Sequence, residues 1–402
     1  MDVVDGVGVR GPLAPYARGF AVELARLGFT RGSAQKQLQL AAHVSRWLGD
    51  AGLGTADLDA RAVDGFLAAR RAAGYGEFIT PKALVPLLGY LRGLDAAPQP
   101  ELPAPQTRAE ELLADYRRWL LAERGLRVKV ARGYVDSVAP FVTAHAAGGE
   151  AGLRNLGAGD VTAFMTAESR RLAPKTVQRL ATALRSLLRF WHLQGLITAP
   201  LDQVVPRIAN RRPGLPQPLE QGQVAELLAS CDLQAATGRR DLAMLTLLAR
   251  MGLRAGEVAG LTLDDIDWRN GEITVAGKGG RRDRLPLPAD AGEATAAYLQ
   301  HGRPAGALDR SVFIRARAPW CGLTGGGVTQ AVAAAAGRAG LGTIYAHRLR
   351  HSAATAMLAG GGSLAEIGQV LRHRRPVTTA SYVKVNVEAL RTLARPWPGA
   401  SW

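Results

Sequence analysis

The sequence predicts a mainly α-helical protein with a small β-sheet in its C-terminal part. Leucines and aromatic residues recur at intervals of three and four residues, the spacing of one face of a helix. Two proline-rich breaks interrupt this pattern, so we expect helical domains joined by linkers. Hydrophobic and polar residues alternate in "EITVAGKGGRRDRLPL", residues 272–287, which predicts two short strands with a turn between them.

The two breaks set the predicted domain boundaries. "DAAPQPELPAPQT" and "VVPRIANRRPGLPQP" cannot continue a helix, because proline lacks a backbone N–H and clashes with the preceding turn. We therefore expect an N-terminal helical domain at 1–95, a proline-rich linker at 96–107, a helical domain at 108–203, a basic linker at 204–218, and an α+β domain with a C-terminal tail at 219–402.

The charge of the chain favours a polyanionic partner. Of the 402 residues, 50 are Lys or Arg and 34 are Asp or Glu, which gives a formal net charge of +16. A generic basic surface is the alternative. Two cysteines, Cys231 and Cys321, imply neither a disulfide framework nor a zinc site. Without an apolar leader or an eighteen-residue apolar run, we expect a bacterial cytoplasmic protein at the nucleoid, neither secreted nor membrane-spanning.

The first hundred residues repeat the pattern of the middle segment. "ARAVDGFLAARRAAG" at 60–74 aligns with "AGDVTAFMTAESRRL" at 158–172, and a Val-x-x-Phe step occurs in both. A period of about 97 residues is too long for a solenoid, so we interpret the N-terminal domain as a duplicate of the middle one. The alternative is the leucine spacing that all helical bundles share.

The middle segment combines a hydrophobic core pattern with a cationic flank. Leucines and aromatic residues at helical spacing are expected to form the core. Pro174 opens a helix whose N-terminal end concentrates cations and the positive end of the helix dipole, so we expect this end to enter a DNA groove. A linker could hold arginines by chance, but beside DNA they would bind phosphates. The candidate DNA-binding residues, including those of the following linker, are Arg170, Arg171, Lys175, Arg179, Arg207, Arg211 and Arg212.

Six polar residues of the C-terminal part could together break a phosphodiester without a metal ion. A phenol is a nucleophile once its proton is removed, and guanidiniums bind phosphate oxygens through two parallel donors. Lysine can protonate a leaving oxygen, and histidine titrates near neutrality. No clustered carboxylates stand nearby to hold magnesium, so we expect no metal and no cofactor. In chain order the six are Arg254, Lys278, His347, Arg350, His373 and Tyr382.

The order and spacing of these residues resemble the phage-integrase family of tyrosine recombinases over about residues 215–390. "GLRAGEVAGLTLDDID" looks like the family's first-arginine box, "HRLRHSAAT" like its His-x-x-Arg box, and "LRHRRPVTTASYVKV" like its tyrosine box. Lys278 sits where the family keeps its β-hairpin lysine. Arg372 is a departure, because a glycine commonly precedes the histidine, and this puts the turn conformation in doubt.

The resemblance implies a fold and a reaction. It implies a helical core-binding domain that closes on DNA opposite an α+β catalytic domain. Arg254 and Arg350 would hold the scissile phosphate while Tyr382 attacks it, leaving a 3′ phosphotyrosine and a free 5′ hydroxyl. Glu257 would not touch the phosphate but would orient an arginine or a histidine that does.

The remaining roles and partners follow from the same resemblance. His347 would be the base for the phenol, Lys278 the acid for the leaving oxygen, and His373 a hydrogen-bond donor to the phosphate. His351 is expected to point elsewhere as a structural histidine. The expected partners are a double-stranded recombination site, three further copies in a tetramer on two DNA sites, and accessory proteins.

Two alternatives remain open at this stage. A type IB topoisomerase uses similar groups but rejoins the original strand, and a non-catalytic DNA-binding protein would explain the charge and the helices. The second would have no reason to keep all six polar residues at these spacings. The resemblance implies integration, excision or transposition of a mobile element. The sequence does not decide among these or against chromosome resolution, and it does not identify the DNA target.

Overall fold

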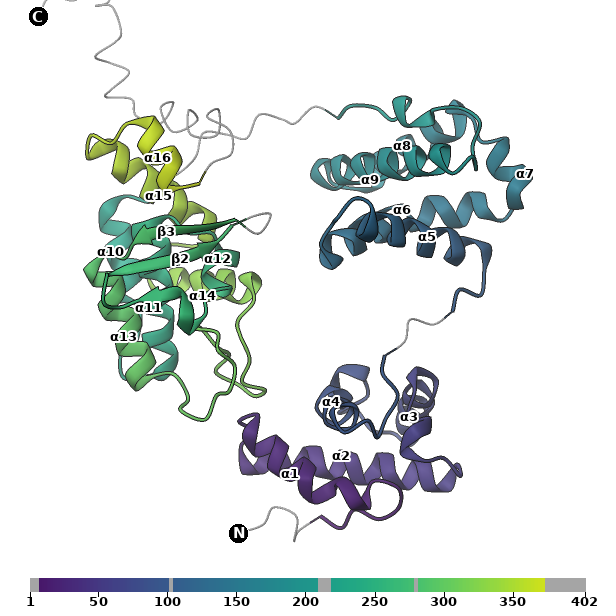
Figure 1. Ribbon diagram of the computed structural model, residues 1–402, viewed down its shortest axis with the longest axis horizontal. Coiled ribbons are helices and arrows are strands. Elements are labelled where there is room, and N and C mark those ends of the chain that lie inside the picture. Colours follow the sequence, from purple (N-terminus) through teal and green to yellow (C-terminus); the bar gives the residue numbers. More distant parts are fainter. Residues whose placement is uncertain (1–6, 101–103, 209–217, 278–280, 373–402) are drawn as a thin grey trace, which may run out of the picture. The chain divides into compact units, whose positions relative to one another are not determined.

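A computed structural model describes residues 7–100, 104–208, 218–277 and 281–372. In these ranges the chain is mainly helical and contains one three-stranded antiparallel sheet, so the predicted fold class is confirmed (Figure 1). The chain divides into two compact units, residues 101–213 and residues 1–100 together with 214–402. Three large hydrophobic cores lie along the chain, one in 7–97, one in 112–205 and one in 219–349.

The N-terminal core is enclosed by four α-helices. α2 begins after Thr30, whose hydroxyl accepts a hydrogen bond from the Ser33 amide, and α3 begins after Asp59, whose carboxylate accepts from the Ala62 amide. Such side chains satisfy amides that have no partner within the helix. The elements are η2 Ala14–Tyr16, α1 Ala17–Arg26, α2 Arg31–Asp50, η3 Thr55–Asp57, α3 Ala60–Ala72, η4 Pro81–Leu84 and α4 Val85–Gly93.

The middle unit is a second helical bundle. Its longest helix, α9, starts with Pro174 in the first turn, as predicted, and buries one apolar face that ends at Trp191. Tyr116 and Trp119 of α5 stack on each other, and both ring systems contact Phe190 of α9. The elements are α5 Arg108–Ala122, α6 Val128–Ala146, α7 Gly149–Arg154, α8 Ala158–Arg171, α9 Pro174–Leu193 and η5 Leu201–Gln203.

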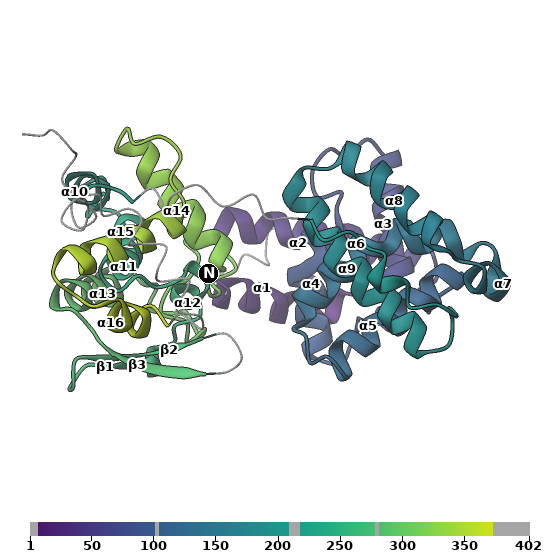
Figure 2. The ribbon, with the colours of Figure 1, turned by 90° about the horizontal axis from the view of Figure 1, so that it is seen from above.

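The C-terminal part packs helices against one side of the sheet (Figures 1 and 2). Ile273 and Val275 of β2 are buried and belong to the helical core, whereas the residues between and beside them are more exposed. The elements are α10 Gln221–Ala229, α11 Ala236–Met251, α12 Ala255–Ala259, η6 Leu263–Asp265, β1 Ile266–Asp267, β2 Glu272–Ala276, β3 Arg282–Pro286, α13 Ala289–His301, α14 Gly325–Arg338, α15 Ala346–Ala359 and α16 Leu364–Val370.

The predicted hairpin is present as β2 and β3. The two strands pair antiparallel from Glu272 opposite Pro286 to Ala276 opposite Arg282. β1, which the sequence pattern did not predict, adds two residues to the other edge of β2. No helix of the described ranges has the length and apolar character to cross a membrane.

A left-handed glycine joins the two helices around Arg254. α11 ends at Met251, Gly252 has φ +60°, and α12 begins at Ala255, so Gly252 lies in the short connection between the two helices. A left-handed residue lets the chain reverse direction sharply, and glycine adopts this conformation without a Cβ clash. Arg254 is thereby the residue that immediately precedes α12.

We predict that Gly252→Ala destabilises the C-terminal part. The backbone conformation costs an L-residue about 1–2 kcal/mol, and the new Cβ would lie 2.5 Å from a methyl of Leu371. The unfolding midpoint in urea should therefore fall. The control is Gly222→Ala, in the first turn of α10, where a Cβ meets nothing within 4 Å and the backbone has no positive φ. An unchanged midpoint for Gly252→Ala would contradict the prediction.

Candidate active site

Arg254 and Glu257 form a closed pair at the start of α12. The Arg254 amide donates to Glu257 Oε2 at 2.8 Å, and the guanidinium Nη1 donates to Oε1 at 2.6 Å. The Glu257 side chain is 6% exposed, whereas that of Arg254 is 45% exposed. The carboxylate therefore fixes the arginine from inside the protein and leaves its outer side accessible.

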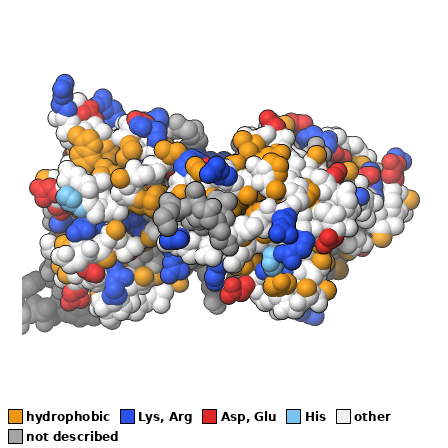
Figure 3. Space-filling model, turned by 90° about the horizontal axis from the view of Figure 1, so that it is seen from below, with side chains coloured by type: hydrophobic (Ala, Val, Ile, Leu, Met, Phe, Trp, Pro, Cys, Tyr) orange, Lys and Arg blue, Asp and Glu red, His pale blue; other side chains and the backbone are white. Residues whose placement is uncertain are grey.

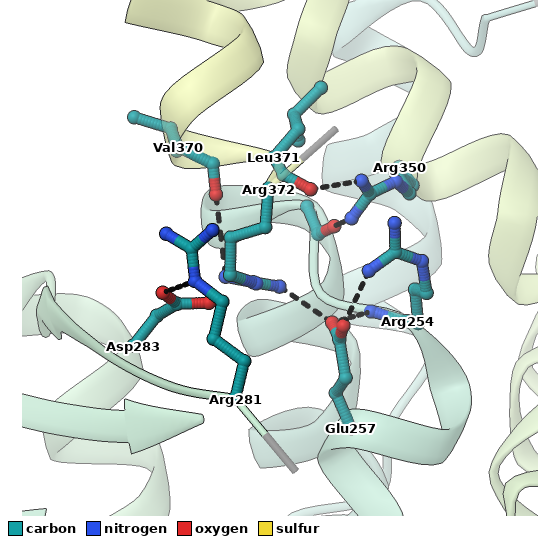
Figure 4. A network of polar contacts seen from close by, with 9 residues as sticks. Arg254, Glu257, Arg281, Asp283, Arg350, Val370, Leu371 and Arg372 are labelled. Atoms are coloured by element: carbon teal, nitrogen blue, oxygen red, sulfur yellow. Dashed lines mark hydrogen bonds and ion pairs between the residues drawn. The ribbon is translucent and has the colours of Figure 1, made fainter. Parts of the chain in front are cut away.

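Glu257 also binds a second arginine. Arg372 Nη2 donates to Glu257 Oε2 at 2.6 Å, from a side chain that is 6% exposed (Figure 4). Burial raises the pKa of Glu257, but hydrogen bonds from Arg254 and the charges of both arginines outweigh it and hold that pKa below its usual value. Glu257 is therefore an anion shared by two guanidiniums.

Arg350 holds the same region together from α15. Its side chain is buried, Nη1 donates to the Gly252 carbonyl, and Nη2 donates to the Leu371 carbonyl (Figure 4). Gly252 lies two residues before Arg254, and Leu371 directly follows α16. An arginine fixed by backbone carbonyls has already lost its rotamer freedom before any substrate binds.

His347 lies one helical turn before Arg350 and is exposed. Its ring centroid is 4.3 Å from that of His351, at an interplanar angle of 70°. The expectation that His351 points elsewhere was wrong, because residues four apart on a helix are neighbours. Burial, and then the neighbouring His347 and Arg350, lower the pKa of His351 to about 4, so it is neutral at pH 7.

Comparison with known proteins identifies the family. A model of the phage integrase family matches residues 217–389. The integrase/recombinase y4rA of Sinorhizobium fredii is 40% identical over 395 residues, which cover 97% of this chain and 95% of that protein. The chain belongs to the phage integrase family. It is thus a tyrosine recombinase, an enzyme that breaks and rejoins DNA strands.

Other members and structures agree with this assignment. The tyrosine recombinase XerC of Rhodospirillum centenum is 33% identical, with 71% of this chain and 86% of that protein covered. The structure of XerH bound to a palindromic difH substrate has a TM-score of 0.57 at 18% identity and covers 84% of this chain and 95% of that one. The likeness to XerH concerns the fold. Neither the topoisomerase nor the non-catalytic alternative is favoured by these similarities.

The structure brings together three of the integrase site residues that the sequence predicted. Arg254 and Glu257 touch directly, and Arg350 binds the backbone that leads to Arg254. His347 is on the same helix as Arg350. The predicted residues that lie outside the described ranges are Lys278, His373, Tyr382, Arg211 and Arg212.

The candidate DNA-binding residues of the middle unit lie on its surface. Arg171 is exposed and pairs with Glu168 at 2.7 Å. The other exposed candidates at the α8–α9 junction and after it are Arg170, Lys175, Arg179 and Arg207. Their exposure makes them accessible to a ligand, and their role in DNA binding stays a prediction.

Arg372 is the site residue whose contacts the sequence did not predict. The sequence showed it as a departure from a glycine and put the turn in doubt, but gave no sign of a partner. The turn keeps the left-handed conformation that favours glycine, with φ +54° at Arg372. Among the described residues, no three His, Cys, Asp or Glu side chains are grouped closely enough to hold a metal ion.

We predict that His351 makes stability depend on pH. A histidine whose pKa is lowered by folding stabilises the protein above its usual pKa of 6.5, and this contribution is lost as the pH falls toward about 4. Calorimetry of wild type and His351→Gln should therefore show a steeper loss of stability for wild type between pH 6.5 and 4. The control is His301→Gln, at the exposed end of α13, which should follow wild type. Parallel profiles for all three proteins would refute the assignment.

Proposed function

We propose that this integrase recombines specific DNA sites through a covalent 3′ phosphotyrosine at Tyr382, in the integration, excision or transposition of a mobile element. The observation that supports this most is the convergence of Arg254 and Arg350. The two arginines are 96 positions apart in the sequence. Arg254 binds Glu257 and Arg350 binds the Gly252 carbonyl, so both are held by the same short stretch of chain, residues 252–257. Two guanidiniums in one place suit a phosphate, which needs several donors at once.

The two arginines would stabilise the charge that develops on the scissile phosphate. In the transition state the non-bridging oxygens gain negative charge, and preorganised guanidiniums bind this state more tightly than the ground state. Glu257 and the carbonyls of Gly252 and Leu371 keep the arginines in place, so little reorganisation is needed when the substrate arrives.

The proton transfers would be made by the other residues of the set. His347, exposed on α15, would take the phenol proton of Tyr382 as that oxygen attacks phosphorus. Lys278 would protonate the departing 5′ oxygen, and His373 would donate to the phosphate. One P–O bond forms as one breaks, and attack by a different 5′ hydroxyl reverses the step, so the reaction consumes no ATP.

The middle unit and the basic linker would bind the duplex, and four copies would assemble on two sites. The chain carries a net charge of +16. Figure 3 shows Lys and Arg side chains on the exposed surface, among acidic and hydrophobic side chains. Exposed Lys and Arg side chains attract DNA phosphates.

We also propose that the N-terminal domain duplicates the middle one. α3 and α8 begin at the aligned positions, residues 60 and 158. Gly28 and Gly125, which also align, both have positive φ, +82° and +56°, after α1 and α5. These matches in helix starts and in turn geometry support one ancestral module, used twice.

We predict that Tyr382→Phe abolishes covalent attachment to DNA but not DNA binding. The substitution removes one oxygen, and phenylalanine offers no nucleophile to phosphorus. A duplex that the wild type captures covalently is first selected from a random pool, and a nicked form of it then traps the adduct on a denaturing gel. Wild type should give the adduct in EDTA.

Two outcomes would contradict this mechanism. A covalent adduct in the Tyr382→Phe protein would place the nucleophile elsewhere. A strict magnesium requirement in wild type would point to carboxylate–metal chemistry instead. DNA binding by the variant, measured by a gel shift, is the control for correct folding.

We predict that the N-terminal domain adds phosphate contacts. The logarithm of the binding constant should fall with the logarithm of salt concentration by about 0.9 for each phosphate neutralised. Removal of residues 1–100 should then make this slope shallower, as measured by fluorescence anisotropy. An equal slope for the two proteins would leave the domain without a DNA contact.

A further inference from the structure

Arg372 occupies a backbone position that disfavours it. It follows the last turn of α16, donates its amide to the Gln369 carbonyl at 2.9 Å, and has φ +54°. Glycine takes this helix-ending conformation without strain, and the family pattern commonly has glycine here. Only contacts of its side chain can offset the backbone strain of an arginine at this position, because glycine makes no such contacts.

The Arg372 side chain is buried beside the pair of Arg254 and Glu257. Its Nη2 donates to Glu257 Oε2 at 2.6 Å, and both side chains are 6% exposed. Nη1 donates to the Val370 carbonyl at 3.3 Å, and Nε has no hydrogen-bond partner among the described residues. Figure 4 shows Arg254 and Arg372 on opposite sides of the Glu257 carboxylate. This geometry makes Glu257 a bridge between two arginines.

The end of α16 is therefore attached to the first-arginine box at two points. Arg350 connects them by donating to the Leu371 and Gly252 carbonyls, and Arg372 binds Glu257 directly. In the sequence the next residue is His373, and Tyr382 follows nine residues later. A glycine at 372 would retain only the first attachment.

The bridge also changes the charge that a substrate meets. A guanidinium paired one-to-one with a carboxylate forms a unit of zero net charge. Two guanidiniums that share one carboxylate carry a net charge of +1, so Arg254 is less completely neutralised by Glu257. Arg254 is the more exposed of the two arginines and is the one that can reach a phosphate.

We propose that Arg372 is a positioning residue for recombination. Through Glu257 it orients Arg254, preserves positive charge at the phosphate site, and fixes the end of α16 against the first-arginine box. In this role it makes no contact with the DNA itself. This role rests on the proposed strand-cleavage function, and one of its three tests is independent of cleavage.

The first test separates rate from binding in four variants. Arg372→Met removes the charge, Arg372→Gly also relieves the backbone, and Arg372→Lys keeps the charge. Arg250→Met is the matched control, because it removes an exposed pair with Asp290 from the same part of the chain. Each variant is measured for its affinity for DNA and for the single-turnover rate of adduct formation with a saturating concentration of the nicked duplex. The temperature is kept well below the unfolding temperature of the variant.

The expected result is a loss of rate without a comparable loss of binding. Arg372→Met and Arg372→Gly should cleave at least about tenfold more slowly, because small displacements of a catalytic group are costly, while affinity changes by no more than about twofold. Arg372→Lys should recover part of the rate, and Arg250→Met should match wild type. The proposal would be overturned if both Arg372→Gly and Arg372→Met cleaved DNA at the wild-type rate.

A double-variant cycle tests whether Arg372 acts through Glu257. In a Glu257→Gln background the bridge is already broken, so adding Arg372→Met should reduce the rate little further. If the two losses instead multiply fully, Arg372 acts independently of Glu257 and the proposal is wrong.

The third test needs no DNA. Hydrogen exchange of the free full-length protein is followed in the amides of α12 and of α16. Arg372→Met should speed exchange in both helices, which are joined by the bridge, and Arg250→Met in neither. Unchanged exchange would overturn the bridge even if the wild type proved unable to trap DNA. Failure of wild-type trapping alone would instead count against the proposed function.

Discussion

The arrangement of the candidate active site depends on one buried carboxylate. Glu257 is charged because its hydrogen bonds and two arginines outweigh the cost of burial. Without it, the two guanidiniums would lose the anion that both of them bind. The carboxylate also accepts a hydrogen bond from the Arg254 amide and so caps the start of α12, the helix to which Glu257 belongs. One side chain therefore serves both the local fold and the placement of the site.

Much of this site could be predicted from the sequence because its parts are local. Alternation of hydrophobic and polar residues on either side of a glycine-rich turn predicted the β2–β3 hairpin. The contact between His347 and His351 was equally local, and a stricter use of helical spacing would have found it. β1 was missed because two residues are too few to show alternation.

The pairing of Arg372 with Glu257 could not be predicted in this way. The two residues are 115 positions apart, and no periodicity links them. The sequence showed only that an arginine stood where glycine is common, which reads as a local conflict. The structure explains the conflict, since the strain of the left-handed backbone is offset by a buried ion pair. Local rules fail where a long-range contact determines the residue, and such positions are often functional.

The start of the C-terminal core has a consequence for how force travels through the chain. Leu219, which directly follows the basic linker, donates its amide to Ser352 Oγ at 2.7 Å, and that hydroxyl donates to the Arg348 carbonyl at 3.0 Å. Ser352 lies two residues after Arg350 on α15. Leu219, where this core begins, is thus hydrogen-bonded to the helix that carries Arg350. A displacement of the Leu219 backbone would therefore act on α15 through Ser352.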